Sequence, residues 1–307
     1  MKPKPPLIFP VRQINLPPVE QGQLSNGLPF YQINRGTQEL VRIELVFWAG
    51  RPYEKHPLVA RTTTALLKEG TLYHSGTAIA EQFDYYGAGL STPFQMDTAN
   101  VVMYALNKQL PQVLPLFMEV LNSPLFPAEE LDAFVMRSQH RLKDDLSKSE
   151  VLAYRHITAR YFGEEHPYGY NSNALQYKQL QRSQIQEHHQ RCYNAQNGFA
   201  LISGHLDKTS EKYVHQALAQ LRQGNQQQAA MMTSRHEEPH FIRLPAQNTS
   251  QSAIRMGRRL FPRQHPDANG MYILAHLLGG YFGSRLMENI REDKGYTYNI
   301  SASYDTL

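Results

Sequence analysis

The order of secondary-structure patterns repeats along this chain, and the repeat constrains the fold more than any single motif does. Hydrophobic periodicity and turn residues predict the order β-β-α-α-β-α-α-α-α-β-α up to about residue 222. After a polar stretch the order begins again as β-β-α-α-β. Because a repeated order is typical of a duplicated unit, we expect an α+β fold of two similar domains. Each would consist of a sheet rich in antiparallel pairs that packs against helices.

Four regions follow from this pattern. Residues 1–20 carry six prolines and predict an extended arm. Residues 21–222 form the first domain, and the Gln- and Met-rich residues 223–238 form a linker. Residues 239–307 begin the second domain, which we expect to be incomplete because its last strand has no further elements to cover it.

The local patterns give approximate bounds for the individual elements. The Asn26-Gly27 turn predicts a hairpin between 22–25 and 28–34. The other expected strands are 41–49, 99–106, 197–204, 240–245, 252–259 and 296–304. The expected helices are 58–69, 77–86, 110–121, 127–148, 150–162, 180–193, 210–221 and 267–278.

Charge and cysteine content exclude several classes of protein. The net charge is +4, but the basic residues are scattered, so we expect no nucleic-acid partner. Cys192 is the single cysteine, which excludes an intrachain disulfide or a cysteine-based zinc site. No apolar run is long enough for a membrane span. The polar start predicts a cytoplasmic protein if Met1 is the native first residue, and a periplasmic one if a signal peptide was removed.

The stretch from Leu277 to Tyr298 contains the clearest local signals for turns and helix ends. Gly279-Gly280 and Gly283 allow backbone segments to approach closely, and Ser284 is a candidate N-cap for a short helix. A Lys-Gly pair at 294–295 predicts the end of that helix, and a strand pattern follows. Arg291 and Tyr298 lie on either side of this stop, so they could converge on one point.

Several short motifs, in this order and spacing, resemble the pitrilysin-like family of inverted zincins, which includes the mitochondrial processing peptidases and insulin-degrading enzyme. The motifs that carry the resemblance are Leu24-Ser-Asn-Gly-Leu28, Trp48-Ala-Gly-Arg-Pro-Tyr-Glu54, Leu67-Lys-Glu-Gly-Thr71, Asp84-Tyr-Tyr-Gly-Ala-Gly-Leu90, Phe162-Gly-Glu-Glu-His-Pro-Tyr-Gly169, Leu278-Gly-Gly280 and Ser284-Arg-Leu-Met-Glu-Asn-Ile-Arg-Glu292. The resemblance implies zinc peptidase chemistry from an H-x-x-E-H helix with a further glutamate ligand downstream.

This chain departs from the family pattern at the zinc site. The resemblance places the motif just before Gly70-Thr71, where Arg61 and Ala65 replace the two histidines and Thr64 replaces the general base. The family spacing places the last ligand at Arg141. A divalent cation would be repelled by two of these residues and would have no ligand from the others. We therefore expect no metal or other cofactor in this chain.

Of two other family features, the substrate-binding strand is altered in this chain and the Arg/Tyr pair is kept. The family's substrate-binding strand corresponds to Leu90-Ser-Thr-Pro93, where Pro93 removes a hydrogen-bond donor from the sheet edge. Arg291 and Tyr298 match a family pair that holds the substrate backbone and stabilises the oxyanion. The alternative is structural, with Arg291 capping its helix and Tyr298 filling the core.

The combined pattern predicts a non-catalytic, metal-free subunit of a pitrilysin-type peptidase. It would pair with a zinc-bearing homologue, as a heterodimer, or with a second copy of itself, and would supply Arg291 and Tyr298 for peptide binding. A structural or peptide-binding module without a role in proteolysis is the alternative, and an active zinc endopeptidase is a third hypothesis. Whether the chain is an enzyme is left open, because the family is catalytic but the ligands and base are absent.

Two histidine motifs are interpreted as decoys. His236-Glu-Glu-Pro-His240 matches H-E-x-x-H, but Pro239 would break the helix that such a site needs. His188 and His189 are adjacent, so they point to different faces of a helix, and we expect them at the surface or in loop packing.

Overall fold

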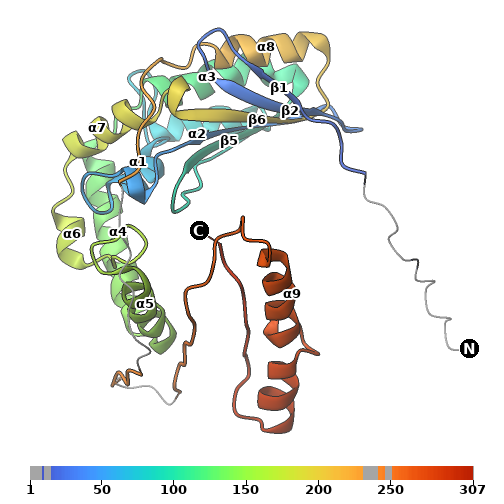
Figure 1. Cartoon of the computed structure of the whole chain (residues 1–307). Coiled ribbons are helices and arrows are strands. Elements are labelled where there is room, and N and C mark those ends of the chain that lie inside the picture. Colours follow the sequence, from blue (N-terminus) through green and yellow to red (C-terminus); the bar gives the residue numbers. More distant parts are fainter. Residues whose placement is uncertain (1–8, 10–14, 231–240, 246–250, 307) are drawn as a thin grey trace, which may run out of the picture.

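The computed structural model describes residues 9, 15–230, 241–245 and 251–306 (Figure 1). The predicted linker lies partly and the His236–His240 motif wholly outside the described residues. The division into arm, two domains and linker therefore stays a prediction.

A six-stranded mixed sheet forms the centre of the N-terminal part of the structure, in the order β1-β2-β6-β3-β5-β4. All neighbours are antiparallel except β2 and β6, which run parallel. The β1–β2 hairpin is the one predicted around Asn26-Gly27, where Gly27 has a φ of +86° that favours glycine. The strands are β1 Glu20–Gln23, β2 Pro29–Asn34, β3 Leu40–Phe47, β4 Gly89–Ser91, β5 Ala99–Leu106 and β6 Gly198–Gly204.

Helices cover one face of this sheet, with α3 and α8 above it and α2 behind it in Figure 1. The α-helices are α1 Val59–Leu66, α2 Gly76–Tyr85, α3 Leu110–Asn122, α4 Ala128–Leu146, α5 Ser149–Phe162, α6 Ala174–Lys178, α7 Arg182–Cys192, α8 Lys208–Leu218 and α9 Ala268–Gly279. Short helical turns occur at Arg51–Tyr53, Asn107–Gln109 and Ala195–Asn197, and Met287–Asp293 forms a π-helix.

The core lies between the sheet and these helices. Alternate residues of β3, namely Val41, Ile43, Leu45 and Phe47, are completely buried, as the period of two in a strand requires. Burial of each such side chain stabilises the fold by about 1.5–3 kcal/mol. On the opposite face, Tyr104 remains 47% exposed. The predicted α+β class, an antiparallel-rich sheet against helices, is confirmed for this part of the structure.

The predicted strands of the second domain are not found among the described residues. Residues 252–259 and 296–304 are extended but join no sheet, and 241–245 form no strand either. Isolated contacts hold the two extended segments instead, such as the Tyr304 hydroxyl donating to the Phe261 carbonyl at 2.8 Å. The pattern was misleading because a strand also needs a neighbour to accept its backbone hydrogen bonds, which sequence alternation does not provide.

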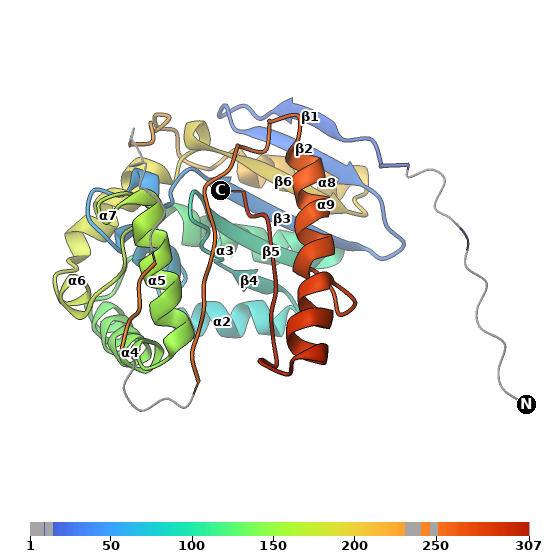
Figure 2. The same ribbon diagram turned by 60° about the horizontal axis from the view of Figure 1, so that its bottom comes forward.

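The C-terminal segment first follows α5 and then forms a separate arm below the sheet (Figures 1 and 2). The guanidinium of Arg255 lies 5.9 Å from the Tyr154 ring centre, and that of Arg259 lies 6.0 Å from the Phe162 ring centre. The α9 helix leaves a row of apolar side chains largely exposed: Tyr272, Ile273, Leu274, Leu277 and Leu278. Within the described ranges, no helix has the length and hydropathy that crossing a bilayer requires.

Candidate functional site

Helix α1 carries the positions of the degenerate zinc motif. Three consecutive threonines, Thr62, Thr63 and Thr64, are fully buried, and each hydroxyl donates to the carbonyl four residues earlier at 2.7–2.9 Å. Such back-bonding satisfies a buried hydroxyl within its own helix. The centre of the motif is therefore part of the core and offers no open coordination position.

Thr64, which the resemblance places at the position of the family's general base, has a second partner just after α7. Its hydroxyl oxygen lies 2.9 Å from the Tyr193 hydroxyl, which is also completely buried. Because the single Thr64 proton is directed to the Ala60 carbonyl, Tyr193 donates this hydrogen bond. Two neutral hydroxyls thus lie at the position that the family resemblance assigns to the general base.

The remaining motif positions lie at the surface, near the crossing of α1 and α4. Arg61 and Arg141 are exposed, and Ala65 is half-buried. Both guanidiniums act on the same carboxylate: the hydrogen bond from Lys148 lowers the pKa of Asp145 most, and Arg141 and Arg61 lower it further. The structure therefore brings these distant sequence positions together, but as cations.

The chemistry of this donor set does not fit zinc. Zinc sites use thiolate, imidazole or carboxylate ligands, and none of the four positions supplies one. Over the described part of the chain, no group of three or more His, Cys, Asp or Glu side chains is placed to hold a metal ion.

A buried carboxylate anchors the start of α1. Glu54 accepts hydrogen bonds from the Ala60 backbone N–H at 3.0 Å and from the Tyr170 hydroxyl at 2.6 Å. Arg51 lies over the Tyr170 ring, 4.3 Å from its centre, and donates to the Tyr170 carbonyl at 3.3 Å. Burial raises the pKa of Glu54 to about 7, although these hydrogen bonds and Arg51 oppose the shift. Sequence reasoning missed this network because its members come from segments that are far apart in the sequence.

His188 and His189 are core residues, so the expectation of a surface position was wrong. They are 2% and 3% exposed, and their Nε2 atoms lie 3.0 and 2.9 Å from the carbonyl oxygens of Ala49 and Leu121. Burial lowers the pKa of His188 to about 4 and that of His189 to about 3. Both faces of α7 are covered here, which adjacency in the sequence could not reveal.

The C-terminal pair lies on the arm, on either side of Gly295. Arg291 lies 3.2 Å from the Glu292 carboxylate and 5.4 Å from the Phe282 ring centre. Tyr298 is 89% exposed. The short helix before them differs from the expected one, because the Ser284 hydroxyl is buried without a partner among the described residues and residues 287–293 form a π-helix.

The predicted substrate strand is an edge of the sheet. Strand β4 pairs with β5 through Gly89–Tyr104, Leu90–Met103 and Ser91–Val102, and within the described residues its other side has no strand. The ladder continues past it only as an isolated bridge between Phe94 and Ala99. Pro93 follows the strand, as its missing N–H predicts.

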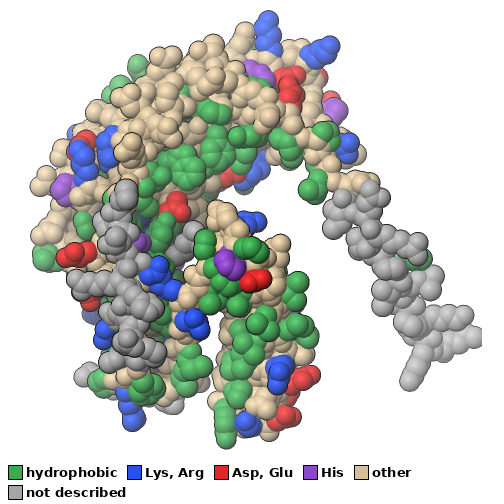
Figure 3. Space-filling model, viewed as in Figure 1, with side chains coloured by type: hydrophobic (Ala, Val, Ile, Leu, Met, Phe, Trp, Pro, Cys, Tyr) green, Lys and Arg blue, Asp and Glu red, His purple; other side chains and the backbone are tan. Residues whose placement is uncertain are grey.

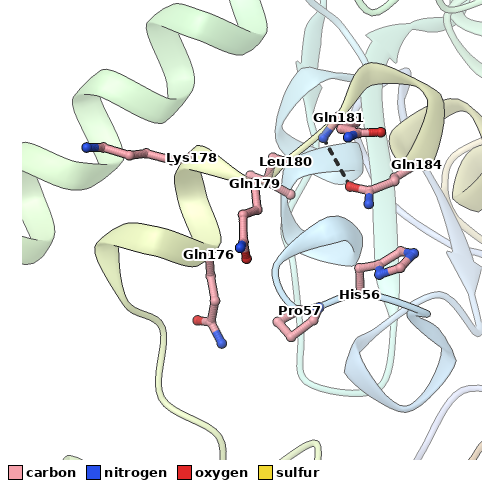
Figure 4. Close-up of a pocket in the computed structure, with 8 residues that line it drawn as sticks. All are labelled: His56, Pro57, Gln176, Lys178, Gln179, Leu180, Gln181 and Gln184. Carbon is pink, nitrogen blue, oxygen red and sulfur yellow. Dashed lines mark hydrogen bonds between the residues drawn. The ribbon is translucent and has the colours of Figure 1, made fainter.

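A cavity of about 390 Å³ lies between the loop after α6 and the start of α1. Figure 4 shows glutamine side chains around it, with Lys178 directed away. Two of these side-chain amides cap helices. The Gln184 side chain accepts from the Gln181 N–H at 3.0 Å, and the Gln176 side chain accepts from the Asn173 N–H at 3.0 Å. The cavity is therefore mainly a product of helix capping.

Comparison with known proteins supports the predicted family resemblance. Residues 179–307 match the family described as the peptidase M16 inactive domain. Uncharacterised zinc proteases of Mycobacterium bovis and Mycobacterium tuberculosis are each 24% identical over 247 residues, or 78% of this chain. The crystal structure of a peptidase M16 inactive domain from Pseudomonas fluorescens covers 94% of the chain with a TM-score of 0.77 and 25% identity. The C-terminal part of the chain therefore matches a domain of the M16 peptidases, and the whole chain resembles members of that family.

This assignment confirms the pitrilysin-type resemblance and the fold. A protease from Helicobacter pylori has the same fold, with a TM-score of 0.78 over 95% of the chain at 15% identity. The chain spans 56% of the length of the mycobacterial relatives and 71% of the P. fluorescens structure. The matched inactive domain begins after α6, so it does not include the degenerate positions on α1 and α4.

Proposed function

We propose that this M16 chain is a non-catalytic, metal-free subunit that pairs with a zinc-bearing homologue and binds the peptide substrate through Arg291 and Tyr298. One observation carries the proposal. All three ligand positions and the base position are replaced, by Arg61, Thr64, Ala65 and Arg141, in a chain that keeps the Arg/Tyr pair. A lone chain with this composition has no group to activate water.

The side-chain packing around α1 supports the proposal that this chain binds no zinc. Thr64 is packed against Tyr193, and two cations occupy the outer positions. A zinc ion would have to displace a core contact and approach two guanidiniums, both of which are unfavourable. The zinc of the proposed complex therefore belongs to the partner chain.

The exposure of the pair supports a role outside the core. Tyr298 is too exposed to fill the core, and its hydroxyl can reach another molecule. Arg291 is half-buried against Phe282, which limits its conformations while leaving donors available. A guanidinium and a phenol together suit peptide carbonyls and a developing oxyanion.

The decisive experiment mixes this protein with a purified M16 homologue that carries H-x-x-E-H and follows cleavage of a quenched fluorescent peptide library. We expect cleavage only with both chains present. Loss of activity with Arg291→Ala but not with Arg285→Ala, an exposed neighbour, would locate the contribution. Cleavage by the isolated chain, or a pair whose activity ignores Arg291→Ala, would refute the proposal and favour a purely structural module.

A further inference from the structure

A second cavity, of about 300 Å³, lies at the end of β3, and none of the degenerate metal positions lines it. Eight of its nine lining residues offer ring, imidazole or aliphatic surface, and the ninth is an acid. The lining residues are Trp48, Pro52, Tyr53, Asp97, His166, Pro167, Tyr168, Ala229 and Ala230. A concave, mostly apolar cavity with one convergent charged group has the usual character of a ligand site.

Asp97 is the charged group of this cavity. Its Oδ1 accepts a hydrogen bond from the Tyr168 hydroxyl, while its Oδ2 has no donor among the described residues. The carboxylate and the two phenols are close, because Asp97 raises the pKa of both Tyr53 and Tyr168 after the larger effect of burial. Among the described residues, one carboxylate oxygen thus remains available for a donor from a ligand.

His166 adds no positive charge to the cavity. Its Nδ1 accepts the Tyr168 backbone N–H at 3.1 Å, and its ring stacks on Phe162 at 5.2 Å. Burial, with a further contribution from Arg259, lowers the pKa of His166, so the imidazole is neutral at pH 7.

Three arginines near the cavity are committed elsewhere. Arg51 donates to the Pro167 carbonyl at 3.1 Å, and Arg191 donates to the Tyr53 carbonyl. Arg259 lies over the ring of Phe162, outside the lining. These guanidiniums have acceptors or ring faces of their own, and none is part of the cavity wall.

An aromatic row leads across the open face of the sheet to this cavity. The ring of Tyr31 lies 5.9 Å from that of Phe199, and Phe199 lies 6.4 Å from Trp48 at the cavity edge. Apolar side chains also gather along the hollowed inner side of the arch in Figure 3. An extended peptide could therefore lie along the open face with one side chain in the cavity.

We propose that the cavity binds a lysine or arginine side chain of a peptide ligand. The apolar walls suit the methylene stem, the aromatic residues Trp48, Tyr53 and Tyr168 in the lining suit a cation, and Asp97 Oδ2 would accept its N–H. That the ligand is a peptide rests on the proposed function; the cation site itself needs neither a zinc-bearing partner nor Arg291.

Trp48 is the single tryptophan of the chain, so intrinsic fluorescence reports directly on this cavity. The test titrates the isolated protein with N-acetyl-lysine amide, N-acetyl-arginine amide and the neutral N-acetyl-norleucine amide. We expect a saturable change with the two cationic probes and at least about tenfold weaker binding of norleucine. Equal binding of lysine and norleucine, or no saturable change with any probe, would overturn the proposal without any mutation.

Asp97→Asn tests the carboxylate, with Asp84→Asn on the exposed side of α2 as the matched control. The Asp97 loop is held by backbone bonds, Gly50 N–H to the Asp97 carbonyl at 3.0 Å and Arg51 N–H to the Met96 carbonyl at 2.7 Å, so the variant should fold. We expect about tenfold or greater loss of lysine binding in Asp97→Asn and none in Asp84→Asn. Unchanged binding in Asp97→Asn would refute the cation assignment. If the protein binds lysine but does not activate a zinc-bearing partner, the proposed cation site is still supported. In that case only the proposed function as a peptidase subunit is refuted.

Discussion

The hydroxyl oxygens of Thr64 and Tyr193 lie 2.9 Å apart in the core, on helix α1 and just after helix α7. Thr64 is the residue that the family resemblance places at the position of the catalytic base. Thr64 is therefore part of the core packing, because its partner Tyr193 also contacts the rings of Phe47 and His189.

The first prediction concerns this pair. Thr64→Val leaves the Tyr193 hydroxyl without its acceptor and should lower the free energy of unfolding by about 1–3 kcal/mol. Tyr193→Phe should cost about 1 kcal/mol, because Thr64 keeps the Ala60 carbonyl. Urea unfolding of both single variants and the double variant measures the coupling, and we expect the double variant to lose less than the sum. Strict additivity would mean that the hydrogen bond contributes nothing.

The second prediction concerns acid sensitivity from His189. Its folded pKa, about 3, is below the unfolded value of about 6.5, so the unfolded state takes up the proton first. Stability is therefore fully present above pH 6.5 and falls as pH decreases toward 3. By pH 5.5 the loss from this residue should be about 1.4 kcal/mol.

His189→Gln removes this term, so its unfolding free energy should fall less between pH 7.5 and 5.5 than that of the unmodified protein. The exposed His140→Gln on α4 is the control. An identical pH dependence in His189→Gln and the unmodified protein would show that His189 is not held neutral.

The third prediction has the opposite sign. Glu54 has a folded pKa of about 7, above its usual 4.5, so its contribution to stability is present at low pH and is lost as pH rises through 7. Between pH 7.5 and 5.5 it should add about 2 kcal/mol to the free energy of unfolding. Glu54→Gln should lack this gain, whereas the exposed Glu164→Gln should retain it. Chemical denaturation across this pH range measures both.

The fourth prediction concerns metal. If the chain holds no zinc, purified protein should contain far less than one zinc per chain by elemental analysis, and a chelator should leave its Tm unchanged. In the mixed complex, the same chelator should abolish peptide cleavage because the partner's zinc is removed. Stoichiometric zinc in the isolated chain would contradict the metal-free assignment.

The fifth prediction concerns the Arg/Tyr pair in that complex. Tyr298→Phe removes one hydroxyl and should lower kcat/KM about tenfold to a hundredfold, with little effect on unfolding because Tyr298 is so exposed. Tyr296→Phe, an exposed neighbour, is the matched control. Equal activity of both variants would remove Tyr298 from the site.

Sequence alone determined much of this protein. Periodicity located the long helices and the main strands, such as 99–106, because a buried face imposes a regular spacing on each element. The family resemblance predicts that Arg61, Ala65 and Arg141 replace the zinc ligands and that Thr64 replaces the base, and this assignment stays a prediction. Periodicity failed for 252–259 and 296–304, where an alternating pattern did not form a sheet.

Only the tertiary structure decided the environments of the side chains. The burial of His188 and His189, the Thr64–Tyr193 contact, the Glu54 network and the Asp97 cavity all join residues from separate elements. Local propensity depends on neighbours along the chain and determines where helices and strands form. Desolvation and hydrogen-bond partners depend on neighbours in space, which determine pKa values and the shape of a site.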